Sequence, residues 1–362
     1  MAQTADVLEY KCPCCGAGLI FGEESQKMTC QYCDNTFELE AVKDYNDSQE
    51  RTDSEEYTAE ECAKEEWSQQ EQGSLHGFLC PSCAGQIITD ANTAATFCPY
   101  CGNPSIISGR ISGGLKPDGV IPFKTSKEDA KAAFLKLCKG KPLLPKMFIE
   151  EQQLEKITGM YVPFWLYDCS SDFQGRYSAT RIHSWSDANY IYTKTDHYLL
   201  VREADAAFDG IPMDGSSKMD DTFMESIEPY DHDELVDFET AYLSGFLADK
   251  YDVPAENGKE RVRQRVDRSI NDMLQTSFLG FSTVVPTSKQ LRIHQSGTRY
   301  VLLPVWMLNT TYKGKTYTFA MNGQTGKMTG TLPICGKRSA AWFSGIAAAT
   351  AALAYVLQLL FA

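Results

Sequence analysis

One cysteine pattern occurs twice in the first third of this chain: Cys-x2-Cys, fourteen residues, Cys-x2-Cys. The eight cysteines are Cys12, Cys15, Cys30 and Cys33 in the first copy and Cys80, Cys83, Cys98 and Cys101 in the second. A Cys-x2-Cys turn places two thiolates on one side of a tight knuckle, and two facing knuckles supply the tetrahedral four-sulfur shell of a structural zinc. The sequence therefore predicts two Zn²⁺ sites, one in each copy.

The residues around the cysteines are typical of zinc knuckles. Proline follows the first cysteine in three of the four knuckles. Gly16 and Gly102 follow the second cysteine, where the backbone turns back with a positive φ, whereas Ala84 takes this position in the third knuckle. Cys14 lies inside the first knuckle and could replace one of its two cysteines as a ligand. We expect it to be a bystander.

Thiol redox chemistry and rubredoxin-like iron are the alternatives to structural zinc. Redox Cys-x2-Cys pairs occur singly on a strand-to-helix turn, so facing pairs at a fixed spacing favour a structural metal. Residues 1–11 are polar and contain two acids, which is not the pattern of a signal peptide. We therefore expect a reducing compartment, in which zinc thiolate is favoured over disulfide.

The negative charge of the chain is concentrated around the cysteines. The net charge is −14, and residues 1–110 contain four Lys and two Arg against nineteen Asp and Glu, a balance of −13. Nucleic-acid binding draws most of its affinity from cations that neutralise phosphates. The charge therefore disfavours a nucleic-acid partner and favours a protein partner.

An uncharged apolar segment ends the sequence, from Ser339 to Ala362. As a helix it would extend roughly 36 Å, enough to cross a hydrocarbon core of about 30 Å. We predict a transmembrane helix over 337–362 that contacts the membrane through residues 339–362, either as a tail anchor or in a chain lacking later residues. Lys337 and Arg338 precede it, which predicts a single-pass protein of the cell membrane with its N-terminal bulk in the cytoplasm. The alternatives are a buried core helix and an amphipathic tail.

The sequence predicts a multidomain protein: two small β zinc ribbons, an α+β domain with mainly antiparallel strands, and the C-terminal transmembrane helix. The expected boundaries are 1–43 for zinc ribbon 1, 44–74 for an acidic linker, 75–110 for zinc ribbon 2, 111–336 for the α+β domain and 337–362 for the helix. The linker is polar and acidic, so we expect it to be flexible or partly helical. Trp67 within it is expected to pack on a neighbouring ribbon or to be exposed.

Periodicity gives the expected elements. Helices are predicted from Ser126 to a break at Gly140, near 234–250, and over 255–277 with Val262, Val266, Ile270 and Leu274 on one stripe. Strands are predicted at 18–21, 36–39, 121–123, 160–168, 173–181, 189–201, 205–209, 282–285, 290–294, 299–309, 315–321 and 327–331.

A second, fainter duplication lies around 160–180 and 301–321. Both segments contain Pro-apolar-Trp-apolar-apolar-Asp/Asn, followed by aromatic-polar-Gly-basic. Two strand hairpins, each with a buried Trp, would produce this pattern, and coincidental strand composition is the alternative.

Several longer motifs carry a family resemblance. The knuckles CPCCG, CPSC and CPYCG occur together with IPFKTSKEDA, LLPKMF, GMYVPFWLYD, AYLSGFLADKYDV and LLPVWMLNTTYKGKTYTFAMNGQTGK. The chain in this respect resembles uncharacterised bacterial transcription factor IIB-type zinc-ribbon-containing proteins, some of which are named after the primosomal replication-restart helicase. The resemblance implies zinc ribbons but does not indicate what the family does. A helicase would need a phosphate loop, but Asn309 stands where the first glycine before Gly314-Lys315-Thr316 would be required.

Residue patterns typical of enzymes are missing from the sequence. The five histidines form no HExxH pair, and the segment from Asp231 to Glu234 is expected to be a solvated acidic turn rather than a cation site. The leading hypothesis is a non-enzymatic, zinc-binding, membrane-anchored cytoplasmic protein that acts as a protein-interaction or scaffold module. The alternatives are a nucleic-acid-binding zinc-ribbon protein of transcription or replication, and an enzyme whose site lies in the α+β domain.

Overall fold

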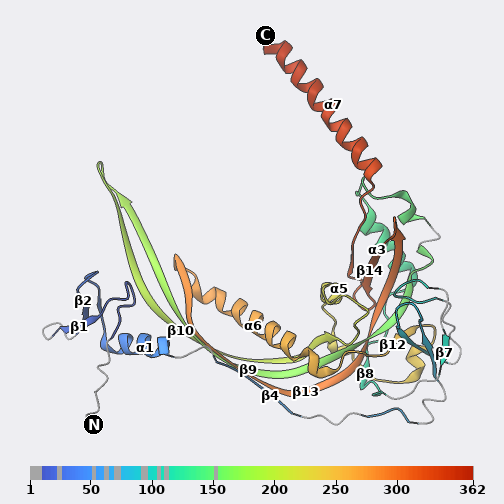
Figure 1. Ribbon diagram of the computed structural model, residues 1–362, viewed down its shortest axis with the longest axis horizontal. Coiled ribbons are helices and arrows are strands. Elements are labelled where there is room, and N and C mark those ends of the chain that lie inside the picture. Colours follow the sequence, from blue (N-terminus) through green and yellow to red (C-terminus); the bar gives the residue numbers. More distant parts are fainter. Residues whose placement is uncertain are drawn as a thin grey trace. The chain divides into compact units, whose positions relative to one another are not determined.

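The computed structural model (Figure 1) divides into two compact units. It describes residues 10–22, 27–50, 54–60, 65–68, 75–90, 97–103, 107–109, 114–150 and 154–361. Unit 1 comprises Met1–Glu61, Tyr167–Asp209 and Lys259–Gly297, and unit 2 comprises Cys62–Leu166, Gly210–Gly258 and Thr298–Ala362. Residues 111–336, expected as one domain, are therefore shared between the two units.

Three long strands contribute residues to both units: β9 (Thr158–Ser186), β10 (Ile191–Asp214) and β13 (Thr283–Tyr312). Each joins stretches for which the sequence predicts separate strands.

The first half of the proposed duplication is wrong. Residues 160–180 lie in the single strand β9 and form no hairpin, because the turn of β9 into β10 comes only at 187–190. The second half is a hairpin, with positive φ at Lys313 and Gly314.

Unit 1 contains the first cysteine group and a short antiparallel sheet of its own, in the order β1-β2-β3. Its elements besides the long strands are β1 (Leu19–Gly22), β2 (Lys27–Cys30), β3 (Thr36–Phe37), α1 (Leu39–Glu50), β4 (Ser54–Ala59), α6 (Lys259–Gln275) and the 3₁₀ turn η5 (Thr276–Phe278). Part of the expected linker is thus regular structure: α1 reaches into it, and β4 pairs in parallel with Gln290–Gln295 of β13.

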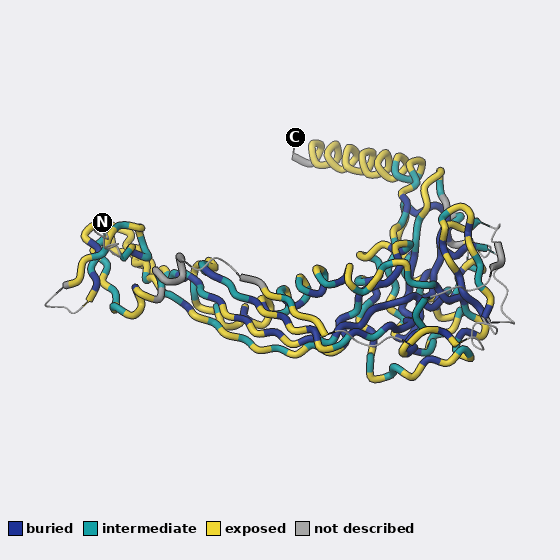
Figure 2. Tube along the Cα trace, turned by 60° about the horizontal axis from the view of Figure 1, so that its bottom comes forward, coloured by how far each residue is buried: buried dark blue, intermediate teal, exposed yellow. Residues whose placement is uncertain are grey.

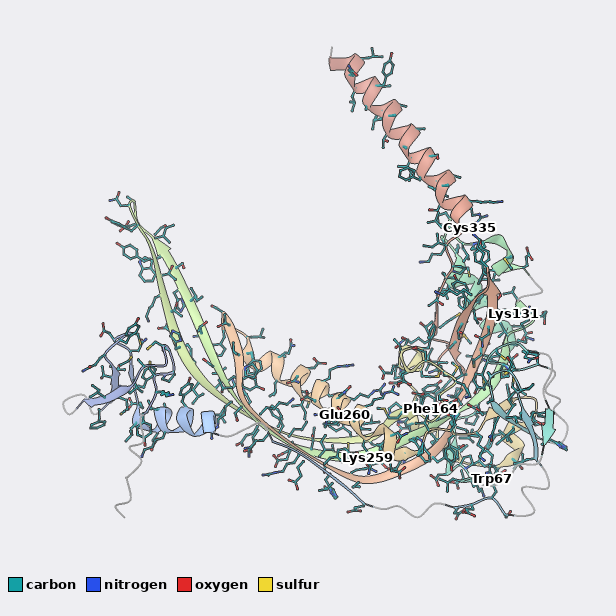
Figure 3. All side chains as sticks on the ribbon, viewed as in Figure 1. Trp67, Lys131, Phe164, Lys259, Glu260 and Cys335 are labelled. Carbon is teal, nitrogen blue, oxygen red and sulfur yellow. The ribbon has the colours of Figure 1, made fainter. Side chains whose placement is uncertain are left out.

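Helix α6 confirms the predicted amphipathic segment (Figure 3, where Lys259 and Glu260 mark its first turn). The four apolar residues of its stripe, Val262, Val266, Ile270 and Leu274, are all buried. Burial of one stripe is what a period of 3.6 residues produces when a helix packs on a sheet.

Unit 2 contains the second cysteine group within a mixed sheet. Its elements are β5 (Leu75–Leu79), β6 (Gln86–Asp90), β7 (Ile107–Gly109), β8 (Gly119–Val120), α3 (Lys127–Cys138), η1 (Lys146–Ile149), α5 (Asp221–Ile227), η2 (His232–Glu234), β11 (Val236–Asp237), η3 (Thr240–Leu243), β12 (Leu247–Asp249), η4 (Ala255–Gly258), β14 (Lys315–Asn322), β15 (Met328–Gly330) and α7 (Gly336–Phe361). The strand order is β11-β8-β13-β9-β12-β6-β5-β7, and β14 and β15 extend from β13. Most assigned pairs in this unit are antiparallel, while β8–β13 and β9–β12 are parallel.

Helix α3 begins where the sequence predicts. Ser126 accepts a hydrogen bond from the backbone N–H of Asp129, and the Asp129 carboxylate accepts one from the backbone of Ser126, which completes a capping box. Gly140, with φ 75°, follows the end of the helix. Ala130 and Phe134 are buried on a cluster that includes Trp306 and Phe319.

The helix predicted near 234–250 is wrong. The segment instead forms η2, β11, η3 and β12. Two physical reasons oppose a continuous helix: Gly245 has a φ of 82°, and Leu247–Asp249 is buried between two neighbouring strands, β6 and β9. Sheet pairing at this site outweighs the helical spacing of the apolar residues.

Helix α7 is the one helix of the described residues that is long and apolar enough to cross a membrane. None of the candidate span Gly336–Leu359 is buried, and Figure 2 shows the helix exposed beyond its first turn. Its first turn is held to the loop before η1: Cys335 N–H donates to the carbonyl of Leu143, and the Arg338 guanidinium donates to the carbonyls of Pro142 and Leu144.

Candidate metal centres

Both predicted sets of four cysteines are brought together. In the first, the Sγ atoms of Cys12 and Cys33 lie 3.6 Å apart and those of Cys15 and Cys30 lie 3.4 Å apart. In the second, the two cross-knuckle distances, Cys80 to Cys101 and Cys83 to Cys98, are both 3.6 Å. Within each group all four sulfurs lie within 4.8 Å of one another, and Cys14 belongs to neither.

These spacings fit a tetrahedral ion rather than disulfides. A metal with about 2.3 Å bonds to four sulfurs requires sulfurs about 3.8 Å apart, whereas a disulfide requires about 2.05 Å. Each group can therefore hold one metal ion.

All four knuckles use the same backbone hydrogen bonds. The carbonyl of the first cysteine accepts from the residue after the second cysteine, at 2.8 to 2.9 Å. That residue has a positive φ in every knuckle: 76° at Gly16, 56° at Asp34, 56° at Ala84 and 72° at Gly102. Glycine takes this conformation without steric cost, and Asp takes it more readily than most residues. Ala84 is the least suited of the four.

Amide groups also point at the sulfurs of the first centre. The Cys14 N–H donates to Cys12 Sγ at 3.4 Å, and the Asn35 side-chain amide donates to Cys33 Sγ at 3.3 Å. The backbone N–H of Asn35 adds to this and is the main reason that the pKa of Cys33 falls to about 6. Such donors stabilise thiolates, the form in which cysteine binds a metal.

The second centre is part of the sheet of unit 2. Strand β6 leaves the knuckle at Cys83 and pairs on one side with β5 and on the other with β12, where Ile88 faces Ala248 and Ile87 faces Asp249. Cys80 and Cys98 are buried in the same apolar cluster as Phe164, which Figure 3 labels. Strand β6 corresponds to β1 of the first ribbon. Strand β12 therefore lies on the side of β6 that corresponds to the β2 side of β1.

The two copies differ most in how far they expose equivalent residues. Tyr32 and Tyr100 both precede the last cysteine of their copy, yet Tyr32 is 82% exposed and Tyr100 is 9% exposed. The hydrogen-bond pattern also makes Ile20 equivalent to Ile88. Ile20 is 50% exposed and Ile88 7%. Both positions are therefore covered in the second ribbon and exposed in the first.

Comparison with known proteins gives one informative relative. The uncharacterized protein YdjG of Bacillus subtilis (strain 168) is 37% identical to the chain over 344 residues, which cover 95% of this chain and 95% of the relative. The chain belongs to the YdjG family. No family model and no solved structure matches it.

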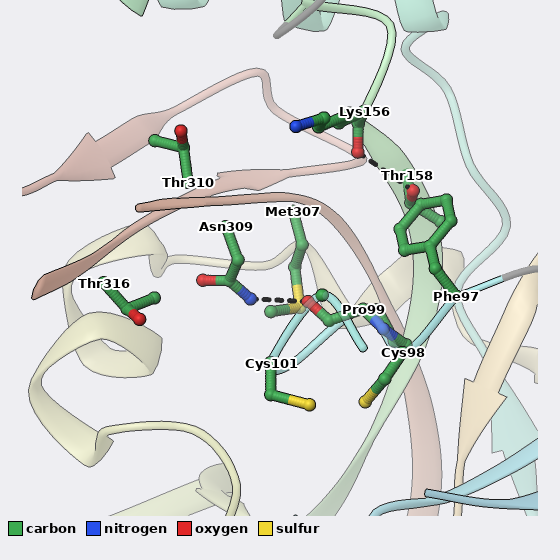
Figure 4. Close-up of a pocket in the computed structure, with 11 residues that line it drawn as sticks. Phe97, Cys98, Pro99, Cys101, Lys156, Thr158, Met307, Asn309, Thr310 and Thr316 are labelled. Atoms are coloured by element: carbon green, nitrogen blue, oxygen red, sulfur yellow. Dashed lines mark hydrogen bonds between the residues drawn. The ribbon is translucent and has the colours of Figure 1, made fainter. Parts of the chain in front are cut away.

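The second centre of this YdjG-family chain borders a cavity of about 380 Å³ (Figure 4). Cys98 and Cys101 lie on its wall, with Lys156, Thr158 and Thr310 among the other lining residues. The Asn309 side-chain amide donates to the carbonyl of Pro99, and Thr318 donates to Asn309 Oδ1 at 2.6 Å, which fastens the knuckle to β13 and β14.

The other sequence candidates form no metal-ligand cluster among the described residues. Asp231 to Glu234 is a turn, as predicted: Asp231 caps η2, and Glu234 pairs with Lys124 and accepts from Gln324. Trp67 is buried and contacts Phe238 edge-on at 5.6 Å between ring centroids.

Replacing Ala84 by glycine should stabilise unit 2. A non-glycine residue with positive φ costs about 1 kcal/mol, so Ala84→Gly should raise the free energy of unfolding by about that amount. The measurement is the thermal midpoint of the metal-loaded protein.

Gly102→Ala is the matched control for this prediction. A Cβ at Gly102 would meet no atom within 4 Å, so only the backbone effect remains, and the midpoint should fall. A lower midpoint for Ala84→Gly would show that the turn is not strained.

Proposed function

We propose that this chain is a zinc-binding protein anchored in a membrane by α7, and that its first ribbon recognises a protein partner. The observation that carries the proposal is the contrast between the two copies. Tyr100 and Ile88, which the second copy buries in its own unit, correspond to the exposed residues Tyr32 and Ile20 of the first copy.

Zinc is the metal that best fits four sulfurs. An all-thiolate tetrahedral site selects zinc or iron. Four cysteine ligands leave no coordination position open, which is typical of structural zinc. Structural zinc contributes on the order of 10 kcal/mol or more to the folding of a small ribbon. In the second copy that energy would also support the sheet into which β6 is built.

Metal analysis tests this step. Protein purified from membranes without added metal should contain about two zinc ions per chain, measured by elemental analysis. Iron in their place, or no metal in folded protein, would contradict the proposal.

The membrane anchor rests on the composition of α7. It has no charged residue after Arg338, and its apolar side chains are exposed rather than packed on the chain. Lys337 and Arg338 at its first turn favour an orientation with the preceding residues on the cytoplasmic side.

A protein partner fits the first ribbon better than nucleic acid does. The first 110 residues carry a balance of −13, which repels phosphates. Exposed aromatic side chains at a knuckle are the kind of residue that anchors protein interfaces, where truncating a hot-spot residue costs about 2 kcal/mol or more.

Replacing Tyr32 by serine should remove most of the partner binding. Because a loss of about 2 kcal/mol of binding free energy corresponds to roughly thirtyfold in affinity, we expect the affinity to fall by that factor or more. The measurement is quantitative recovery of co-purifying proteins from solubilised membranes, with zinc content checked in parallel.

Leu279→Ser is the control, because Leu279 is equally exposed at 78% but lies outside the ribbon. It should leave recovery unchanged. Equal recovery with Tyr32→Ser and wild type would move recognition away from the first ribbon, and salt-sensitive DNA binding would favour the nucleic-acid alternative.

A further inference from the structure

The hairpin of β9 and β10 in unit 1 ends in a cluster of exposed aromatic and apolar side chains. We define the hairpin tip as Ser184–Thr193. Within it Trp185 is 54% exposed, Tyr190 67% and Ile191 81%. Tyr192 stacks on Trp185, with ring centroids 5.7 Å apart and an angle of 13° between the planes. Figure 1 shows the two strands continuing together to this turn.

The polar groups of the tip are bonded within the tip. Asp187 is its one charged residue, and its carboxylate accepts from the N–H groups of Asn189 and Tyr190, at 2.8 and 2.7 Å, and from the Tyr192 hydroxyl at 3.0 Å. The Asp187 N–H donates to the carbonyl of Tyr190 at 3.0 Å. Groups that are already hydrogen-bonded lose less on leaving water than free ones.

Charged residues begin immediately below the tip. Lys194 pairs with Asp196 at 2.9 Å, and His183 lies 3.9 Å from the other oxygen of the same carboxylate. The hairpin thus carries an aromatic end above a band of charge. This is the order of side chains found where proteins meet the headgroup region of a bilayer, in which Trp and Tyr are enriched.

A lipid surface fits the tip better than a protein does. A specific protein interface uses about 20–30 residues on each side, and the tip has only ten residues on a two-stranded ribbon. A bilayer needs no matching shape, and α7 would bring one within reach of the whole chain, which raises its effective concentration.

We propose that the tip inserts Trp185, Tyr190 and Ile191 into the headgroup region of a zwitterionic bilayer. The tip has no basic residue, so the interaction should not require anionic lipid. The inference rests on the membrane anchor proposed above for supplying the bilayer. It gives unit 1 a membrane contact of its own.

Tryptophan fluorescence tests the proposal on the full-length protein. Three of the five tryptophans, Trp67, Trp165 and Trp306, are buried, so Trp185 and Trp342 of α7 are the two that a lipid quencher can reach. The protein would be reconstituted in phosphatidylcholine vesicles, with and without bromine near the headgroup end of the acyl chains. The emission of each exposed tryptophan is obtained by subtracting the spectrum of Trp185→Phe or Trp342→Phe.

We expect the Trp185 emission to be quenched to an extent comparable with that of Trp342, equally at low and high salt. Ile191→Ser combined with Tyr190→Ser should reduce the quenching of Trp185 and leave that of Trp342 unchanged, whereas Leu279→Ser should change neither. These substitutions are at exposed positions, and far-ultraviolet circular dichroism would verify the fold.

The two proposals fail in different ways. Quenching of Trp342 without quenching of Trp185 would overturn tip insertion and leave the anchor intact. Quenching of Trp185 alone would support the tip and contradict the anchor. If Trp185 is unquenched in lipid but its emission shifts with protein concentration, the tip binds a second copy of the chain and the proposal is wrong.

Discussion

The pairing of β6 with β12 is the interaction on which the structure of unit 2 depends. Strand β6 follows the knuckle of Cys80 and Cys83 and pairs with β12, and β12 in turn pairs with β9. Cys80 and Cys98 lie in the apolar core cluster of this unit, although an isolated zinc ribbon has little core of its own. We therefore expect metal binding and sheet formation to be coupled in this unit.

The first copy of the same pattern is built differently. Its strand β1 pairs with β2 of the same ribbon, so its sheet is complete without a body strand. Tyr32 and Ile20 are therefore exposed, whereas the equivalent residues of the second copy, Tyr100 and Ile88, are covered. One sequence repeat thus supports two arrangements: the second knuckle packs within its own unit, and the equivalent positions of the first are exposed.

Local patterns in the sequence predicted local structure well. The cysteine spacing gave both four-sulfur groups, Ser126 and Asp129 gave the start of α3, and the stripe from Val262 to Leu274 gave the buried face of α6. Each depends on residues close together in the chain. The positive φ expected after the second cysteine also occurs at Asp34 and Ala84, although neither residue is glycine.

Features that depend on distant residues could not be read from the sequence. Residues 247–249 carry a helical pattern, yet their partners Ile87 and Met160 lie far away in the sequence and hold them as a strand. The sequence predicts two strands where β9 is continuous, because the neighbouring strands β12 and β13 that pair with it lie far away in the sequence. Tyr100 lies beside Asp249 of β12, and nothing in the local sequence distinguishes it from the exposed Tyr32.

Hydrogen exchange in paired cysteine variants tests most directly whether the second metal centre is part of the sheet. Cys80→Ser/Cys83→Ser should lose protection at the amides of Leu247–Asp249 and of the first residues of β9, since removing a structural metal withdraws on the order of 10 kcal/mol of folding free energy. Cys12→Ser/Cys15→Ser should leave those amides as protected as in the wild type. Equal protection of β12 in both variants would contradict the account, because the sheet would then be stable without its metal.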